Sequence, residues 1–158
     1  MVVAWKKLQK KIRIVDSLFN IKETYKTVFN SIRSKGFITV EKEQSFKSGQ
    51  YGDELKLDIN GFKLSDDFAK IDIVITLVFT ELKKYKDIHR GNLVIDITIS
   101  ITLDYKHKWG TNGFNKFLMK IYLKLLDNEL KKKYFSLALS DVNDLYDNLK
   151  DILNEYKH

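Results

Sequence analysis

The sequence predicts an α+β protein in which helices pack on one face of an antiparallel sheet of four or five strands. Two long segments, 71–80 and 93–105, alternate between apolar and polar residues, as strands do when one face of an antiparallel sheet is buried. Two later segments, 114–125 and 142–156, instead repeat apolar residues at helical spacing. The chain contains no proline, so its composition includes nothing that would interrupt these segments.

The first half of the chain predicts a strand, a helix and a hairpin. Residues 8–19 show the weak alternation of a first strand. Asn20 precedes Glu23 by three residues, the pattern of a capping box, and Gly36 stands at the position of a C-terminal glycine. A helix is therefore expected over 21–35. After it come two strands and the glycine turn that joins them: 37–47, 54–62 and 48–53.

The second half supplies the long strands and the helices that should cover them. Residues 85–92 are expected to form a hairpin loop between the long strands, which should pair near the middle of the sheet. The helices should cover the buried face with two apolar stripes: Phe114, Phe117, Leu118, Ile121, Tyr122 and Leu125, then Val142, Leu145, Tyr146, Leu149, Ile152, Leu153 and Tyr156. Four aspartates should lie on the outer side of the last helix: Asp141, Asp144, Asp147 and Asp151.

The predicted order of elements is β-α-β-β-β-β-α-α in a single domain, 1–158. This order is comparable to that of helix-grip proteins, in which a curved antiparallel sheet holds a long C-terminal helix over an apolar cavity. The chain has one or two strands fewer than the usual helix-grip domain. Such an analogy concerns the fold and carries no function with it.

Composition argues against several kinds of chemistry. The chain has no cysteine, which excludes disulfides, thiolate catalysis and thiolate-bound metals. Its histidines, His89, His107 and His158, are scattered and lack the spacing of a metal site. The sequence contains no G-x-S-x-G motif, which would mark a nucleophilic serine. We therefore expect a protein that is not an enzyme and that uses no metal or cofactor.

The segment DYKHKWGTNGFNKFL, residues 104–118, resembles a family of small uncharacterised archaeal proteins. That family has a D-Y-x-x-K-W-x-x-N-x-F-x-K-F-L segment and a final helix similar to residues 137–157, and residues 24–43 are similar to its opening helix and strand. The sequence departs from the family at His107, where glycine is expected, and at Gly113, where proline is expected. The resemblance implies a shared fold and an archaeal origin, and it implies no activity.

Four residues of the same segment are candidates for contact with a ligand: Tyr105, Trp109, Asn112 and Phe114. Their aromatic rings could line a pocket, and a glycine loop before a helix can bind an anion. The structural alternative is a joint between a strand and a helix. In that case Tyr105 would end the buried face of the strand, Thr111 or Asn112 would cap the helix, and Trp109 would close the core. We favour the joint.

The net charge of +7 makes nucleic acid the alternative partner. Its excess of positive charge lies near the N-terminus, at Lys6, Lys7, Lys10, Lys11 and Arg13. Only three of the 28 cationic residues are arginine, although arginine is the side chain best suited to bases and phosphates. Nucleic acid therefore ranks second.

The sequence thus predicts a non-enzymatic binding protein. It would use a groove between sheet and helices for a small apolar ligand or a protein partner, and a cavity of roughly a few hundred Å³ there would favour the ligand. The N-terminus lacks the apolar core of a signal peptide, and the apolar run 117–126 is too short to span a bilayer. A soluble, cytoplasmic protein without a membrane partner is expected.

Overall fold

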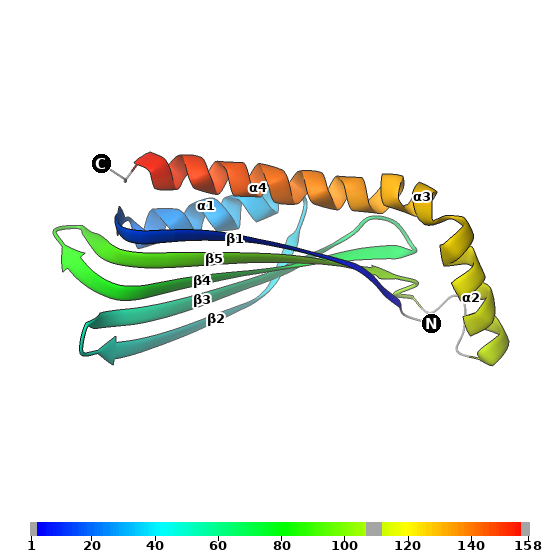
Figure 1. Cartoon of the computed structure of the whole chain (residues 1–158), viewed down its shortest axis with the longest axis horizontal. Coiled ribbons are helices and arrows are strands. Elements are labelled where there is room, and N and C mark those ends of the chain that lie inside the picture. Colours follow the sequence, from blue (N-terminus) through cyan, green and yellow to red (C-terminus); the bar gives the residue numbers. More distant parts are fainter. Residues whose placement is uncertain (1–2, 107–111, 156–158) are drawn as a thin grey trace.

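Five strands form one antiparallel sheet in the order β1-β5-β4-β3-β2 (Figure 1). This computed structural model describes residues 3–106 and 112–155, apart from the side chains of residues 3–6, 40–43, 152, 154 and 155. The strands are β1 (Val3–Phe19), β2 (Ile38–Gly49), β3 (Gly52–Leu64), β4 (Ala69–Tyr85) and β5 (Ile88–Leu103). The helices are α1 (Ile21–Ser34), α2 (Gly113–Leu125), α3 (Asp127–Leu130) and α4 (Ser136–Glu155), with a π-helical turn, η1 (Lys131–Phe135), before α4. The predicted fold class and order of elements are confirmed.

The two long strands pair with each other in the middle of the sheet, as predicted. Their register places Ile75 opposite Ile97, and both side chains are fully buried. The predicted loop at 85–92 is wrong in length, because the strands continue to a two-residue turn at Lys86 and Asp87. Lys86 adopts a left-handed backbone conformation with φ 56°. The polar residues after this turn belong to β5 because β1 also pairs with them.

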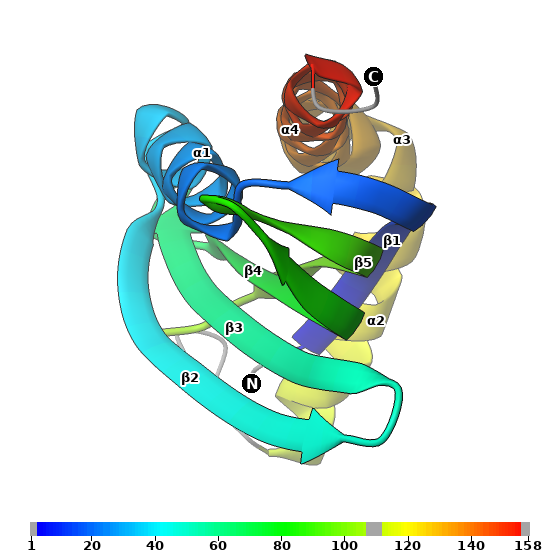
Figure 2. The same cartoon turned by 90° about the vertical axis from the view of Figure 1, so that its left-hand side faces the viewer.

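Helices α1 and α4 lie side by side on the apolar face of the sheet, α1 toward β2 and β3, and α4 toward β1 (Figure 2). The Asn20 side chain caps α1 by accepting a hydrogen bond from the Glu23 N–H at 3.1 Å. Gly36 follows the helix with φ 88°, a conformation that favours glycine, so both predicted helix ends are confirmed. Helix α4 carries the apolar stripe that was predicted for it. Among its described side chains, the buried members of this stripe are Val142, Leu145, Leu149 and Leu153.

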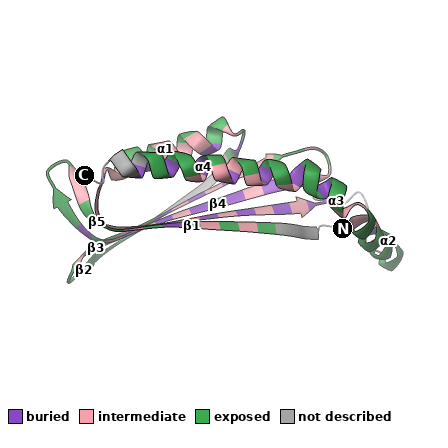
Figure 3. Ribbon diagram, turned by 45° about the horizontal axis from the view of Figure 1, so that its top comes forward, coloured by how far each residue is buried: buried purple, intermediate pink, exposed green. Residues whose placement is uncertain are grey.

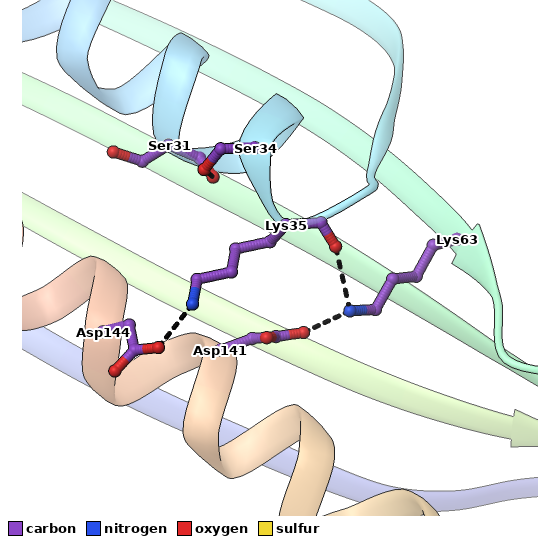
Figure 4. Close-up of polar contacts among 6 residues, drawn as sticks. All are labelled: Ser31, Ser34, Lys35, Lys63, Asp141 and Asp144. Carbon is purple, nitrogen blue, oxygen red and sulfur yellow. Dashed lines mark hydrogen bonds and ion pairs between the residues drawn. The ribbon is translucent and has the colours of Figure 1, made fainter.

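Two ion pairs connect α4 with β3 and with the end of α1 (Figure 4). Lys63 of β3 forms an ion pair with Asp141 and donates a hydrogen bond of 3.1 Å to the carbonyl oxygen of Lys35. Lys35 in turn forms an ion pair with Asp144. Asp141 was expected on the outer side of its helix, but its side chain is only 15% exposed because it turns toward Lys63.

Helix α2 does not cover the sheet, contrary to the prediction. It lies beyond the ends of the strands (Figure 1) and packs on the rest of the protein through the buried Met119 and through Tyr122, whose ring meets Phe68 edge-on at 5.9 Å. Phe114 is 68% exposed and Leu125 is 76% exposed. Since α1 and α4 already cover the apolar face, the stripe that was predicted to be buried faces solvent instead, with the exception of Tyr122.

Bulges interrupt β1 and β4 at the same end of the sheet. The register shifts between Ile14 and Ser17 in β1 and between Thr80 and Lys83 in β4. The extra residue of β4 also shifts its pairing with β3 between Asp53 and Leu55. Two bulge residues, Asp16 and Glu81, have left-handed backbones with φ 49° and 53°. Bulges bend and twist strands, which accounts for the strong curvature of the sheet seen along its strands (Figure 2).

Candidate functional site

A groove of about 730 Å³ opens at the bulged end of the sheet, the left-hand end in Figure 1. It lies between the first turns of α1, the β2–β3 hairpin and the β4–β5 hairpin. Its volume falls within the range of roughly 300–1,000 Å³ that is usual for ligand pockets. The lining residues are Asn20, Ile21, Lys22, Tyr25, Gln44, Phe46, Leu55, Leu57, Asp58, Leu82, Asp87 and His89.

The apolar surface of the groove comes from the pairing of β2 with β3. Phe46 lies opposite Leu55, and Gln44 lies opposite Leu57. Residues directly opposite each other in an antiparallel pair share one face, so these four side chains lie together on the face that carries the helices. Leu57 and Leu82 are buried beneath the groove, whereas Phe46 is 59% exposed at its mouth.

Helix α1 forms the opposite wall of the groove. Ile21 and Tyr25 are one helical turn apart and pack against the core while also lining the groove. The ring of Tyr25 stacks on Phe29 with centroids 6.1 Å apart, which restrains its position. The wall is therefore apolar and partly fixed.

Polar groups gather where α1 meets the β4–β5 hairpin. Phe19, the last residue of β1, pairs with His89, so the imidazole lies beside the start of α1. Asn20 and Lys22 from the helix and Asp87 from the hairpin complete this polar rim. Such an arrangement can hold an apolar body and hydrogen-bond a polar group at one end of it. Among the residues whose positions are described, no three His, Asp or Glu side chains could hold a metal ion together.

Of the four candidates at 105–114, the three that the structure describes, Tyr105, Asn112 and Phe114, do not line this groove. Tyr105 does not end the buried face of β5, because Asp104 is buried with φ 54° and turns the chain. The Tyr105 hydroxyl instead donates a hydrogen bond of 2.8 Å to the carbonyl oxygen of Asp66. Asn112 caps α2 by accepting from the Asn115 N–H at 2.7 Å, as the joint predicts, and Phe114 is exposed. Trp109 and His107 lie outside the described residues.

The cationic cluster of β1 is divided between the two faces of the sheet. Lys10 points toward α4, where its Nζ lies 2.5 Å from Asn143 Oδ1 and 4.8 Å from the centre of the Tyr146 ring. Lys7, Lys11 and Arg13 alternate with Lys10 and therefore lie on the other face, where Lys11 is 3.8 Å from Asp96. The side chain of Lys6 lies outside the described residues.

Comparison with known proteins does not assign the chain. No protein-family model matches it, and no curated protein is similar enough to count as a match. The resemblance to small archaeal proteins therefore stays a prediction. No helix within 3–106 or 112–155 is both long enough and apolar enough to cross a membrane.

Proposed function

We propose that this protein binds a small, largely apolar molecule in the groove between α1 and the β2–β3 hairpin. One observation carries the proposal. The apolar face of the sheet is covered along most of its length, but at the bulged end it leaves a groove of about 730 Å³ with Leu57 and Leu82 at its base. Among the residues whose side chains the structure describes, none fills this space.

The energetics favour an apolar occupant. Each Å² of apolar surface removed from water contributes roughly 25 cal/mol, and the side chains of Phe46, Leu55 and Tyr25 offer such surface to a ligand. The polar rim at Lys22, Asp87 and His89 would orient the ligand by hydrogen bonds to a polar group. We therefore favour an amphipathic molecule whose chain or ring lies along the leucines.

Binding of anilinonaphthalene sulfonate, a fluorescent apolar probe, tests the proposal. The wild-type protein should bind the probe saturably at a single site, and the medium-chain carboxylate decanoate should displace it. Phe46→Gln and Leu55→Gln remove apolar contacts from the groove and should each weaken probe binding about tenfold, a loss of about 1.4 kcal/mol.

Tyr51→Gln is the matched control. Tyr51 is an exposed aromatic residue of the same hairpin, 74% exposed, and it does not line the groove. Its replacement should leave the affinity unchanged. Equal weakening by all three substitutions, or a lack of saturable binding, would contradict the proposal.

The groove could instead bind a segment of a protein partner. β2 is an edge strand of the sheet and lines the groove, so an extended peptide could pair with it and place a side chain among the leucines. Nucleic acid is a separate candidate, supported by the position of Lys7, Lys11 and Arg13 on one face of β1. Its test is given in the Discussion.

A further inference from the structure

Helix α2 presents an apolar face to solvent at the end of the molecule opposite the groove (Figure 1). Five large apolar side chains of this helix are exposed: Phe114, Phe117, Leu118, Ile121 and Leu125. Their spacing of i, i+3, i+4, i+7 and i+11 places them within an arc of about 100° on the helix. Exposed residues dominate α2, in contrast to the alternating burial of the strands (Figure 3). The exposed arc is therefore a continuous surface.

Three lysines line one margin of this arc. Lys116, Lys120 and Lys124 repeat every four residues, and all three are exposed. Helix α2 contains no aspartate or glutamate. The first acidic residue after it, Asp127, forms an ion pair of 2.8 Å with Lys131. The apolar arc thus has a positively charged border without negative charges of its own.

The opposite side of α2 fixes how the helix is presented. Met119 is fully buried, and Tyr122 packs edge-on against Phe68 at 5.9 Å. A helix turns by about 100° per residue. Met119 therefore lies about 160° around the helix from Phe117, and Tyr122 lies about 160° from Lys120. The apolar arc and its lysines consequently face away from the body of the protein, as a single outward surface.

We propose that α2 docks flat on an anionic lipid bilayer. Phe114, Phe117 and Leu125 would enter the boundary between headgroups and acyl chains, and the lysines would contact the acidic headgroups. A helix with large apolar residues on one side and lysines beside them is suited to this interface. A second copy of the chain fits less well, because pairing two such arcs would bring two rows of lysines together without an opposing charge.

This inference is independent of the groove, which lies at the other end of the molecule. It also departs from the expectation that the protein has no membrane partner. That expectation rests on the length needed to span a bilayer, whereas a helix lying in the plane of the interface needs no such length.

Co-sedimentation with lipid vesicles tests the inference on the full chain. The wild-type protein should sediment with vesicles of phosphatidylcholine mixed with an equal amount of phosphatidylglycerol, and it should stay in solution with phosphatidylcholine alone. A juxtamembrane lysine contributes about 1 kcal/mol at an anionic surface. Changing Lys116, Lys120 and Lys124 to glutamine should therefore weaken vesicle binding on the order of a hundredfold.

Two controls make the result specific. The variant Lys26→Gln, Lys47→Gln, Lys84→Gln removes the same charge from exposed positions on α1, β2 and β4, and it should bind like the wild type. A second α2 variant, Phe117→Gln with Leu125→Gln, should abolish binding at unchanged charge. Because both of its substituted residues are exposed, its unfolding midpoint should match that of the wild type.

Several outcomes would overturn the inference. One is equal binding by the wild type and both α2 variants, and another is no binding to the mixed vesicles. Equal binding to neutral vesicles would show that charge does not matter. Sedimentation velocity without lipid gives the remaining outcome: a dimer that Phe117→Gln with Leu125→Gln disperses would assign the arc to a second copy of the chain.

Discussion

The phenol of Tyr134 donates a hydrogen bond of 2.7 Å to the carboxylate of Asp66, which lies 68 residues earlier in the chain. The same carboxylate accepts from the N–H groups of Phe68 at 2.8 Å and Ala69 at 2.9 Å, and Lys133 Nζ lies 3.1 Å away. One side chain thus organises the β3–β4 turn and attaches it to η1. Partial burial and the hydrogen bond to Asp66 raise the pKa of Tyr134, so this hydroxyl stays neutral and keeps donating at ordinary pH.

Asp66 should make the stability of the protein sensitive to acid. Partial burial alone would raise the pKa of this carboxyl, but the hydrogen bonds from Tyr134, Ala69, Phe68 and Lys133 lower it to about 2. A depressed pKa in the folded state stabilises the fold above the unfolded pKa of about 3.9, and this contribution is lost as the pH falls from about 4 to about 2. After allowance for solvent screening we expect about 1 kcal/mol.

Asp66→Asn and Tyr134→Phe measure this contribution. Each variant should unfold at a lower urea concentration than the wild type at pH 7, and the difference should shrink between pH 4 and pH 2. Urea titrations at several pH values provide the test. A constant difference across that range would show that the Asp66 carboxylate does not carry the effect.

The two aspartates that attach α4 should differ in importance. Asp141 and its partner Lys63 have side chains that are 15% and 21% exposed, whereas Asp144 is 51% exposed. Asp141→Asn leaves Lys63 partly buried and less well paired, so we expect a loss of about 1–3 kcal/mol. Asp144→Asn should cost less than about 1 kcal/mol. Denaturant midpoints at equal slope compare the two, and equal losses would contradict the interpretation.

Replacing a glycine that packs against a bulge should destabilise the protein, because there is no room for a side chain. A Cβ atom at Gly91 would lie 2.7 Å from the carbonyl oxygen of Thr80 and 3.1 Å from that of Glu81. Because both neighbours are backbone atoms, Gly91→Ala should destabilise the protein by about 1–3 kcal/mol. Gly113→Ala is the control: nothing lies within 4 Å of its Cβ position, and the change should be neutral or stabilise α2 by up to about 1 kcal/mol. Thermal unfolding of both variants tests the contrast.

If nucleic acid is the partner, binding should depend on the outer face of β1. Each phosphate contact steepens the fall of log affinity with log salt by about 0.9, so Lys7, Lys11 and Arg13 together should give a slope of about −2.7. Replacing these three by glutamine should abolish binding. Lys10→Gln should not, because Lys10 faces α4. This candidate would be excluded if Lys10→Gln alone abolished binding. It would also be excluded if the wild-type protein bound neither single strands nor duplex at low salt.

Sequence patterns predicted the fold because the strands and α4 have a single apolar face. The alternation of β4 and β5 identifies their buried side without knowledge of their partners, and the cap at Asn20 marks the start of α1. The same patterns failed for α2. Its stripe at Phe114 to Leu125 has the spacing of a buried helix face, and spacing alone does not show whether the sheet is already covered.

The sequence predicted that a groove lies between sheet and helices, but not which residues line it. A space between sheet and helices was expected, but its lining depends on the bulges at Asp16 and Glu81, where residues other than glycine adopt left-handed backbones. Aspartate is common at left-handed positions, which is a weak signal at Asp16, but glutamate gives no such signal at Glu81. Phe46 and Leu55 did belong to predicted strands, and their pairing across the hairpin could have indicated a shared face.

At the bulged end, the residues that set the backbone are largely different from the residues that line the groove. Asp16, Glu81, Gly52 and Gly91 set the backbone at this end of the sheet, and none of them lines the groove. Lining residues such as Phe46 lie outside the bulges, whereas Leu82 lies in the bulge of β4 and also at the base of the groove. Ligand preference can therefore diverge through lining residues while the backbone is retained, so homologues with different ligands should keep the two glycines and vary at the groove.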